Sequence, residues 1–437
     1  MRKTILLGTS LILLQIPLLA YVLLHERTWG GTDRDGAGGV AVAADGNVYV
    51  TGVTRSFGAG GDDAFLLKYN ANGVLQWQRT YGTAPDAENS GSEMGIDVAA
   101  APDGSGVVVL GNYRDGNIFL AKFNPAGTLI WDRTWGGNQE GASAIAIAPN
   151  GTIYVTGITF SFDVDQGDAF LLSFTSAGAL NWQRTWGGPF FDVARGVAVA
   201  SDGNIFITGE TLFTANAAFL VKFDGAGSVI WQREWGLTGK GGFPEDDDTD
   251  GNAVAAAPDG GAFVVGATTG TGVDPNLVAV RFDSAGNFVW QRVGGPGFGA
   301  ALDVAVGPDG SVHITGGVLA ADGSSPGNAF VWTLSPAGKG SEAALWGGDD
   351  PFQSDSGASI AVAPTGAVVV AGVAGESPYA FGRGSKTAKA ARTFINTIAG
   401  TITTPAGAVA DPLAVVMIPA GSETFAGDTD AFLIRVQ

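Results

Sequence analysis

The chain has 437 residues, of which 23 are Lys or Arg and 42 are Asp or Glu, so its formal net charge is −19. A charge of this sign repels nucleic acid, and we expect no nucleic-acid partner. Charged residues make up only 15% of the chain, 69 residues are glycine and none is cysteine. This composition disfavours disorder and an all-helical fold, and it excludes disulfides, thiolate metal sites and cysteine nucleophiles.

The start of the chain has the pattern of an export signal. Met1-Arg2-Lys3 is basic, and the stretch 4–24 carries no charge, as in the n-region and h-region of a secretory signal. We place the signal at 1–20 and the mature domain at 21–437. The alternative is an uncleaved anchor, because 21 uncharged residues also suffice to span a bilayer at about 1.5 Å each. Either way we expect an exported protein, extracellular, on the cell surface or in the periplasm, with no membrane contact beyond such an anchor.

One unit recurs along the rest of the chain. Seven turn signals follow one another: Asp45-Gly46, Asp103-Gly104, Asn150-Gly151, Asp202-Gly203, Asp259-Gly260, Asp309-Gly310 and Thr365-Gly366. Their glycines lie 47 to 58 residues apart, a period that fits a four-stranded propeller blade. A strand-like run lies on both sides of each signal, such as Val40–Ala43 and Val48–Thr51, which predicts a hairpin.

A variable stretch and a second hairpin complete each unit. In the first unit this hairpin consists of Ala64–Tyr69, a turn at Asn70–Gly73, and Leu75–Thr80. Each unit is therefore four antiparallel strands, named a to d from the axis outward. The sequence predicts an all-β fold, a seven-bladed β-propeller of four-stranded antiparallel blades in one domain. The sixth unit departs from the repeat at Glu342-Ala343-Ala344, where the Trp-x-Arg of strand d is missing.

The two ends of the chain complement each other. The seventh unit ends with a strand c at Ala431–Gln437, and residues Leu23–Gly31 have the pattern of a strand d that precedes the first strand a. We infer that the N-terminal strand completes the last blade, which closes the ring and removes two exposed sheet edges.

Several segments that recur in order resemble a known family. The Trp-Gly-Gly, Ala-Val-Ala-x-x-Pro-Asp-Gly-Asn-x-Tyr-Val-Thr-Gly and Asp-Ala-Phe-Leu-x-Lys-Phe stretches look like the bacterial seven-bladed β-propeller repeat (SBBP-type) of exported and cell-surface proteins. The resemblance covers roughly residues 22 to 437. It implies a scaffold and a location, and it supplies no catalytic residues.

The connections between strands divide into two sets on opposite faces of the disc. The a-to-b and c-to-d turns are short and form the tight-turn face, whereas the b-to-c and d-to-a connections vary in length and form the long-loop face. Because function tends to lie on variable loops held by a rigid frame, we expect a non-enzymatic scaffold that binds a protein or glycan through the long-loop face. No nucleophile and base pair, metal triad or cofactor fingerprint can be assembled. The alternative is an extracellular polysaccharide hydrolase or lyase that uses two loop carboxylates.

An insert at about residues 374–428 interrupts the seventh unit. We expect it to be a surface arm that packs on blade seven. It carries four basic residues in a short stretch, Arg383, Lys386, Lys389 and Arg392. On a chain of this net charge, these residues are candidates for gripping an acidic partner or a neighbouring copy.

Residues that recur in nearly every unit are expected to be structural. They are the Asx before strand c, at Asp63, Asn117, Asp168, Asn276, Asn328 and Asp430, and the arginine of strand d, at Arg27, Arg79, Arg133, Arg184, Arg233 and Arg292. The two histidines, His25 and His313, stand where other units have aromatic residues, so we expect structural roles for them as well.

The strongest chemical motif is the acidic run 246–251, Asp-Asp-Asp-Thr-Asp-Gly. Three carboxylates at alternate positions, Asp246, Asp248 and Asp250, have the spacing that wraps calcium, and the glycine permits a sharp turn. Val254 and Ala257 stand where known loops place a further carboxylate, so the ligand set is incomplete. A solvated acidic loop is the alternative. Calcium is the only cofactor that the sequence suggests.

A calcium site in this run predicts that calcium raises the unfolding temperature of the mature domain relative to a chelator, because a ligand that binds only the folded state stabilises it. The rise should disappear in the double variant Asp248→Ala, Asp250→Ala. An unfolding temperature that does not respond to calcium would identify the run as a solvated surface.

Overall fold

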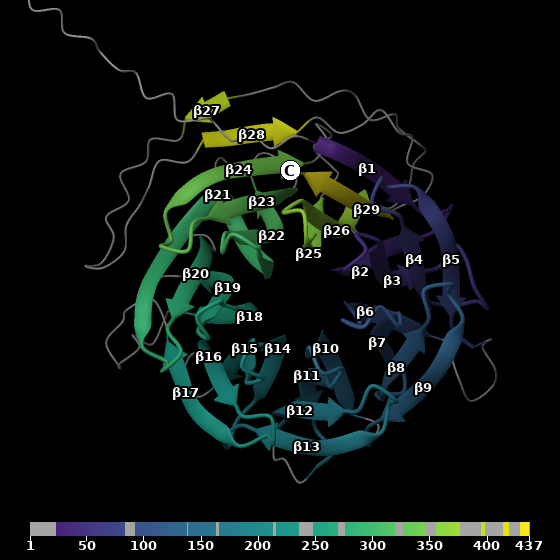
Figure 1. Cartoon of the computed structure of the whole chain (residues 1–437), viewed down its shortest axis with the longest axis horizontal. Coiled ribbons are helices and arrows are strands. Elements are labelled where there is room, and N and C mark those ends of the chain that lie inside the picture. The colour runs from purple at the N-terminus through teal and green to yellow at the C-terminus, as the bar shows by residue number, and fades with distance from the viewer. Residues whose placement is uncertain are drawn as a thin grey trace, which may run out of the picture.

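The computed structural model describes residues 23–83, 92–137, 139–162, 166–212, 216–235, 248–269, 276–319, 327–346, 355–375, 395–397, 414–418 and 429–436. All regular structure in these ranges is β-strand (Figure 1). The expected signal at 1–20 lies outside them. No helix in these ranges has the length and apolar character needed to cross a membrane.

Seven four-stranded antiparallel blades surround a central axis (Figure 1), which confirms the predicted fold. Blade one consists of β2 (Asp35–Val42), β3 (Val48–Thr54), β4 (Asp63–Tyr69) and β5 (Leu75–Tyr81). Blade two consists of β6 (Glu93–Ala100), β7 (Val107–Tyr113), β8 (Ile118–Phe123) and β9 (Leu129–Trp135). Blade three consists of β10 (Glu140–Ile147), β11 (Ile153–Thr159), β12 (Asp168–Phe174) and β13 (Leu180–Trp186).

The remaining blades follow the same order with two variations. Blade four consists of β14 (Asp192–Val199), β15 (Ile205–Leu212), β16 (Asn216–Phe223) and β17 (Val229–Trp235). Blade five consists of β18 (Asp248–Ala256), β19 (Ala262–Thr269), β20 (Asn276–Phe282) and the first part of β21 (Phe288–Val306), which continues into blade six with β22 (Val312–Leu319), β23 (Asn328–Leu334) and β24 (Gly340–Trp346). Blade seven consists of β25 (Ser356–Val362), β26 (Val368–Gly375), β29 (Thr429–Val436) and β1 (Leu23–Trp29).

The hydrophobic core lies between the blades. Each of seven clusters of buried apolar side chains among the described residues joins two adjacent blades. Strands b and c are therefore buried on both faces, and every residue of β8 is buried. Strand d forms the outer edge and is mostly exposed, as in β9. This is the burial expected when each sheet packs between two others around an axis.

The Thr-Gly step in strand b illustrates how closely the strands pack. Thr156 Oγ donates a hydrogen bond of 2.6 Å to the carbonyl oxygen of Phe170. A β-carbon at Gly157 would lie 2.0 Å from the carbonyl oxygen of Gly141 and 2.9 Å from the Phe170 ring. Only glycine fits at this point, which explains why the step recurs in the repeat.

The N-terminal strand closes the ring, as the sequence predicts. β1 pairs antiparallel with β29, and Thr28 lies opposite Phe432. Side chains of β1 also contact both neighbouring blades. Trp346 Nε1 of blade six donates to Glu26 Oε1 at 3.2 Å, and Arg27 Nε donates to the carbonyl oxygen of Gly73 in blade one at 2.9 Å.

Blade six has a complete outer strand although its sequence departs from the repeat. β24 pairs with β23, and Ala343 and Ala344 are buried. Part of the insert adds to this strand: β28 (Ala414–Ile418) pairs parallel with β24, and β27 (Ile395–Thr397) pairs with β28 (Figure 1). The expectation that the insert packs on blade seven is wrong for these strands. They extend blade six, whose outer edge would otherwise be left unpaired.

The closure predicts that a chain starting at Thr32 is much less stable than one starting at Tyr21. Loss of β1 removes the partner of β29, and each backbone hydrogen bond contributes about 1 kcal/mol, so the free energy of unfolding should fall by roughly 3 kcal/mol or more. Urea unfolding of the two chains measures the difference. Equal stability would show that the ring closes without β1.

Candidate functional site

Neighbouring blades are joined by the same side-chain bond in nearly every repeat. The arginine of strand d donates through Nε to the carbonyl oxygen of a glycine in the c-to-d turn of the next blade. These bonds are Arg27 to Gly73, Arg79 to Gly127, Arg133 to Gly178, Arg184 to Gly227, Arg233 to Gly286 and Arg292 to Gly338. From Arg79 onward, each guanidinium also lies 5.2–5.6 Å from the ring centre of the tryptophan two positions earlier. The expectation of a structural role for these arginines is confirmed.

A second bridge begins at a cation in strand c. Lys222 Nζ lies 5.1 Å from the centre of the Phe206 ring and donates to the carbonyl oxygens of Gly260 and Ser284 in the next blade, at 3.1 and 3.3 Å. The cation therefore fills the space between two blades on the tight-turn face. The residues at this position are Lys68, Lys122, Lys222, Arg281 and Arg435 in blades one, two, four, five and seven.

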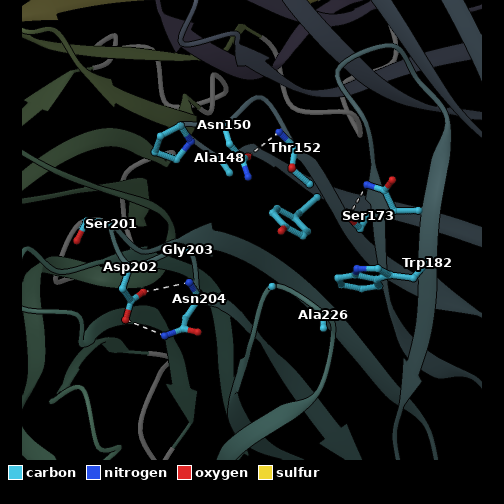
Figure 2. A pocket seen from close by; sticks show the side chains of 14 residues that line it. Ala148, Asn150, Thr152, Ser173, Trp182, Ser201, Asp202, Gly203, Asn204 and Ala226 are labelled. Carbon is cyan, nitrogen blue, oxygen red and sulfur yellow. Dashed lines mark hydrogen bonds between the residues drawn. The ribbon is translucent and has the colours of Figure 1, made fainter.

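Blade three has Ser173 at this position. Ser173 lies opposite Tyr154, as Lys222 lies opposite Phe206. An open pocket of about 670 Å³ lies between blades three and four, and Ser173, itself buried, is among the residues that line it (Figure 2). Tyr154 and Ser173 line the pocket together with Trp182, and the two tight turns of blade four, at 202–204 and 225–226, line the opposite side. This volume is in the range of ordinary ligand sites.

The polar groups of the pocket are held in fixed positions. Asp202 accepts hydrogen bonds from the backbone and side-chain nitrogens of Asn204 at 3.0 and 2.7 Å (Figure 2). Asn181 Nδ2 donates to Ser173 Oγ at 3.3 Å. Burial raises the pKa of Tyr154, while a hydrogen bond with Ser173 lowers it. The phenol therefore stays neutral at physiological pH, and the pocket has an aromatic wall beside a carboxylate and amides.

Trp182 differs from its counterparts in other blades. The indole nitrogens of Trp77, Trp131, Trp231 and Trp290 donate to the second residue of the next c-to-d turn, at Pro125, Ser176, Ser284 and Pro336. No such bond joins Trp182 to Gly225 within the described part of the chain. Its ring lies 6.0 Å from the Tyr154 ring, at an angle of 46°. Trp182 is half-buried and borders the pocket.

The long-loop face holds a layer of acidic side chains at the start of strand a, at its first residue in blades one to four and directly before it in blade seven. Asp35, Glu93, Glu140, Asp192 and Asp355 are all buried. Three of them accept the backbone N–H of the second glycine in Trp-Gly-Gly: Gly31 to Asp35, Gly137 to Glu140 and Gly188 to Asp192, at 2.8, 2.7 and 2.8 Å. These acids hold the d-to-a connections in place. We assign them a structural role.

Two further carboxylates lie near the axis, where a β-bulge re-aims the side chain of strand a. Asp97 accepts the N–H groups of Val98 and Ile145 at 2.8 and 3.0 Å, and so joins blades two and three. Asp303 accepts those of Val304 and Ile360, both at 2.8 Å, and joins blades six and seven.

Both groups have a perturbed acidity. Burial raises the pKa of Asp97 to about 7, with a smaller contribution from the charge of Asp303, and burial raises that of Asp303 to about 6. The backbone N–H groups that donate hydrogen bonds to the two carboxylates lower the pKa of each.

The acidic run forms a strand where the structure describes it. Asp246 lies outside the described residues. Asp248 and Asp250 belong to β18 and pair with Thr269 and Ala267 of β19. A β-carbon at Gly251 would lie 2.5 Å from Thr208 Oγ of blade four, so this glycine permits close packing of two blades rather than a sharp turn. Within the described ranges, no three His, Cys, Asp or Glu residues could hold a metal ion together. Calcium binding by the complete run stays a prediction.

The other predicted residues divide into two groups. Arg383, Lys386, Lys389 and Arg392 lie outside the described residues. His313 is buried and makes hydrogen bonds with Thr333 at 2.8 Å and Ser311 at 2.9 Å. Burial lowers its pKa to about 4, which agrees with a structural role. The pocket, Asp97 and Asp303 were not predicted. The sequence does carry one signal for the pocket: when the seven units are aligned, Ser173 stands at a position where five other units have Lys or Arg.

The fold is shared with solved structures of different proteins. A chain of the mitotic checkpoint complex has a TM-score of 0.50 and 14% identity, over 84% of this chain and 95% of that chain. The periplasmic gluconolactonase of Pseudomonas aeruginosa has a TM-score of 0.47 and 16% identity, over 70% of this chain and 84% of that chain. A puromycin hydrolase mutant complexed with PGG has a TM-score of 0.48 and 16% identity, over 78% of this chain and 50% of that chain. The likeness to the mitotic checkpoint chain shows the fold alone.

No protein-family model and no curated protein matches the chain. Membership of the SBBP-type repeat family therefore stays a prediction.

The raised pKa of Asp97 predicts that the free energy of unfolding falls as the pH rises toward neutral. Between pH 5 and about pH 7 the unfolded carboxyl is already ionised while the folded one still holds its proton, so stability falls as the pH rises toward 7 and levels off above it. The variant Asp97→Asn lacks this titration. Its free energy of unfolding, minus that of the wild type, should grow by about 2 to 3 kcal/mol from pH 5 to pH 8 in urea unfolding. The histidines titrate in both proteins and cancel, so a constant difference would contradict the prediction.

Proposed function

We propose that the chain is an exported, non-enzymatic scaffold that binds a protein or glycan, and that the ligand occupies the pocket between blades three and four. The observation that supports this site is Ser173. It stands where five other blades have a cation, and Ser173 and Tyr154, both buried, line an open pocket together with the half-buried Trp182. Tryptophan and tyrosine offer large contact areas with a polar edge, which suits protein and sugar ligands alike.

The long-loop face is the alternative location. Its described acids already accept hydrogen bonds from the connections that they hold. Parts of its longer loops, at 163–165, 213–215 and 236–247, lie outside the described residues. The expectation that this face binds the ligand therefore stays a prediction, while the described residues favour the tight-turn face.

An extracellular polysaccharide hydrolase or lyase is the second candidate. The observation in its favour is the pair Asp97 and Asp303, because a carboxyl with a raised pKa can serve as a general acid near neutral pH. Both carboxylates, however, accept backbone N–H groups from two blades each. These bonds give them a structural explanation, so we favour binding without catalysis.

The proposal predicts that Trp182→Ala weakens ligand binding at least roughly tenfold, as for a central aromatic contact. The matched control is Trp77→Ala, because the space beside Trp77 is filled by Lys68, and this variant should bind like the wild type. Panels of bacterial polysaccharides and of peptides, measured by biolayer interferometry on the mature domain, supply the ligands. Equal binding by all three proteins would move the site to the long-loop face. Release of reducing ends from a polysaccharide would support the enzyme instead.

A further inference from the structure

We propose that the pocket between blades three and four receives a primary ammonium group, supplied by a lysine side chain of a partner protein. This inference rests on the proposed binding function and names the chemistry of the ligand. Its basis is internal to the chain, because other blades present the same surroundings to a lysine of their own.

The surroundings of the lysine are clearest between blades four and five. Lys222 Nζ lies over the Phe206 ring at 5.1 Å and donates to the carbonyl oxygens of Gly260 and Ser284. An aromatic face and two carbonyl oxygens are suitable partners for an ammonium group, which has three donors and no acceptor. Asp202 adds a carboxylate, with Oδ2 at 3.9 Å from Nζ.

An aromatic side chain and two turn carbonyls also surround the pocket without a cation from strand c, whereas Asn150 stands in blade three where blade four has Asp202. Tyr154 takes the place of Phe206, and Gly203 and Gly225 occupy the turn positions of Gly260 and Ser284. The two turns converge, since a β-carbon at Gly225 would lie 3.9 Å from the carbonyl oxygen of Gly203. An ammonium group that enters here would find the partners that Lys222 has in the next space around the ring.

The electrostatics and the size of the pocket agree with this ligand. Asp202 lines it with a side chain that is 47% exposed, and the chain carries a net charge of −19. Lys222 lies close to the same carboxylate and weakens its attraction for a cation. The volume of about 670 Å³ far exceeds that of an ammonium group. It leaves room for the methylene stem of a lysine against Trp182, as stems of this kind pack on apolar surface.

Blade six shows that loss of the cation alone does not create such a pocket. It has Thr333 at the position of Ser173, but His313 stands opposite and bonds to Thr333 at 2.8 Å. Its imidazole and hydroxyl satisfy each other. In blade three the opposite residue is Tyr154, which is 4% exposed, hydrogen-bonds with Ser173 and lines the pocket.

The test measures binding of two probes to the mature domain by isothermal titration calorimetry. The first probe is n-butylamine, and the second is a short lysine-containing peptide together with its form acetylated on the lysine. We expect the peptide to bind at least about tenfold more tightly than its acetylated form, because acetylation removes a charged hydrogen-bond donor. Butylamine should bind weakly at the same site and compete with the peptide.

Two variants locate the site. Ser173→Lys restores the residue of the other blades and should fill the pocket from within, so that both probes lose binding while the unfolding temperature stays equal or rises. Tyr154→Val places there the residue that blade two has at Val108. It should weaken both probes without filling the pocket.

The reverse change supplies the matched control. Lys68 lies 5.4 Å from the Tyr49 ring and donates to the carbonyl oxygen of Pro125, and the Tyr49 and Trp77 rings lie 6.0 Å apart, as do those of Tyr154 and Trp182. Lys68→Ser should therefore open a second site and raise the stoichiometry of butylamine from one to two.

The outcomes separate the two proposals. Probe binding that is lost in Ser173→Lys and gained in Lys68→Ser supports the ammonium site. Peptide or glycan binding that depends on Trp182 but is unchanged by acetylation overturns the ammonium group and keeps the pocket as the binding site. Binding of butylamine without the peptide overturns a protein partner and indicates a free amine. Binding that neither Ser173→Lys nor Trp182→Ala alters overturns both the ammonium site and the proposed pocket.

Discussion

The ring depends on side-chain hydrogen bonds that cross from one blade to the backbone of the next. Apolar packing between sheets is strong but non-directional, so it does not by itself fix how two blades are aligned. The arginine of strand d provides a direction, because its acceptor is one carbonyl oxygen in a turn of fixed shape. The lysine of strand c adds a second bond of the same kind. Since both acceptors are backbone groups, turn side chains are free to vary.

These bonds explain why most of the fold could be predicted and the candidate site could not. Turn signals and alternating apolar runs are local, so seven units and the closing strand β1 follow directly from the sequence. Asp97 and Asp303 lie at bulges and accept hydrogen bonds from the backbone of the next blade. The spacing of residues along the chain does not reveal these contacts. The pairing of β28 with blade six also depends on an edge that is distant in sequence. The pocket arises from a missing side chain, which no motif search detects.

The acidic run shows how the repeat accounts for part of a motif that also has the spacing of a metal loop. Aligned with the other blades, Thr249 takes the position of Asp35 at the start of strand a, and Gly251 takes the position where a small residue packs against the previous blade. The blade itself therefore explains Thr249 and Gly251, and calcium binding by the aspartates of the run stays a prediction. Departures from the repeat carry more information than matches to it, and Ser173 is such a departure.

The pairing of β1 with β29 places the first and last parts of the propeller in one blade. During synthesis β1 emerges first and its partner last, so the strand must remain unpaired until nearly the whole chain is available. The entropic cost of joining ends that are more than 400 residues apart is met more easily once the other blades have shortened the gap. Closure is therefore expected to be the final step of folding, and until then both edges of the incomplete ring are open to pairing with another chain.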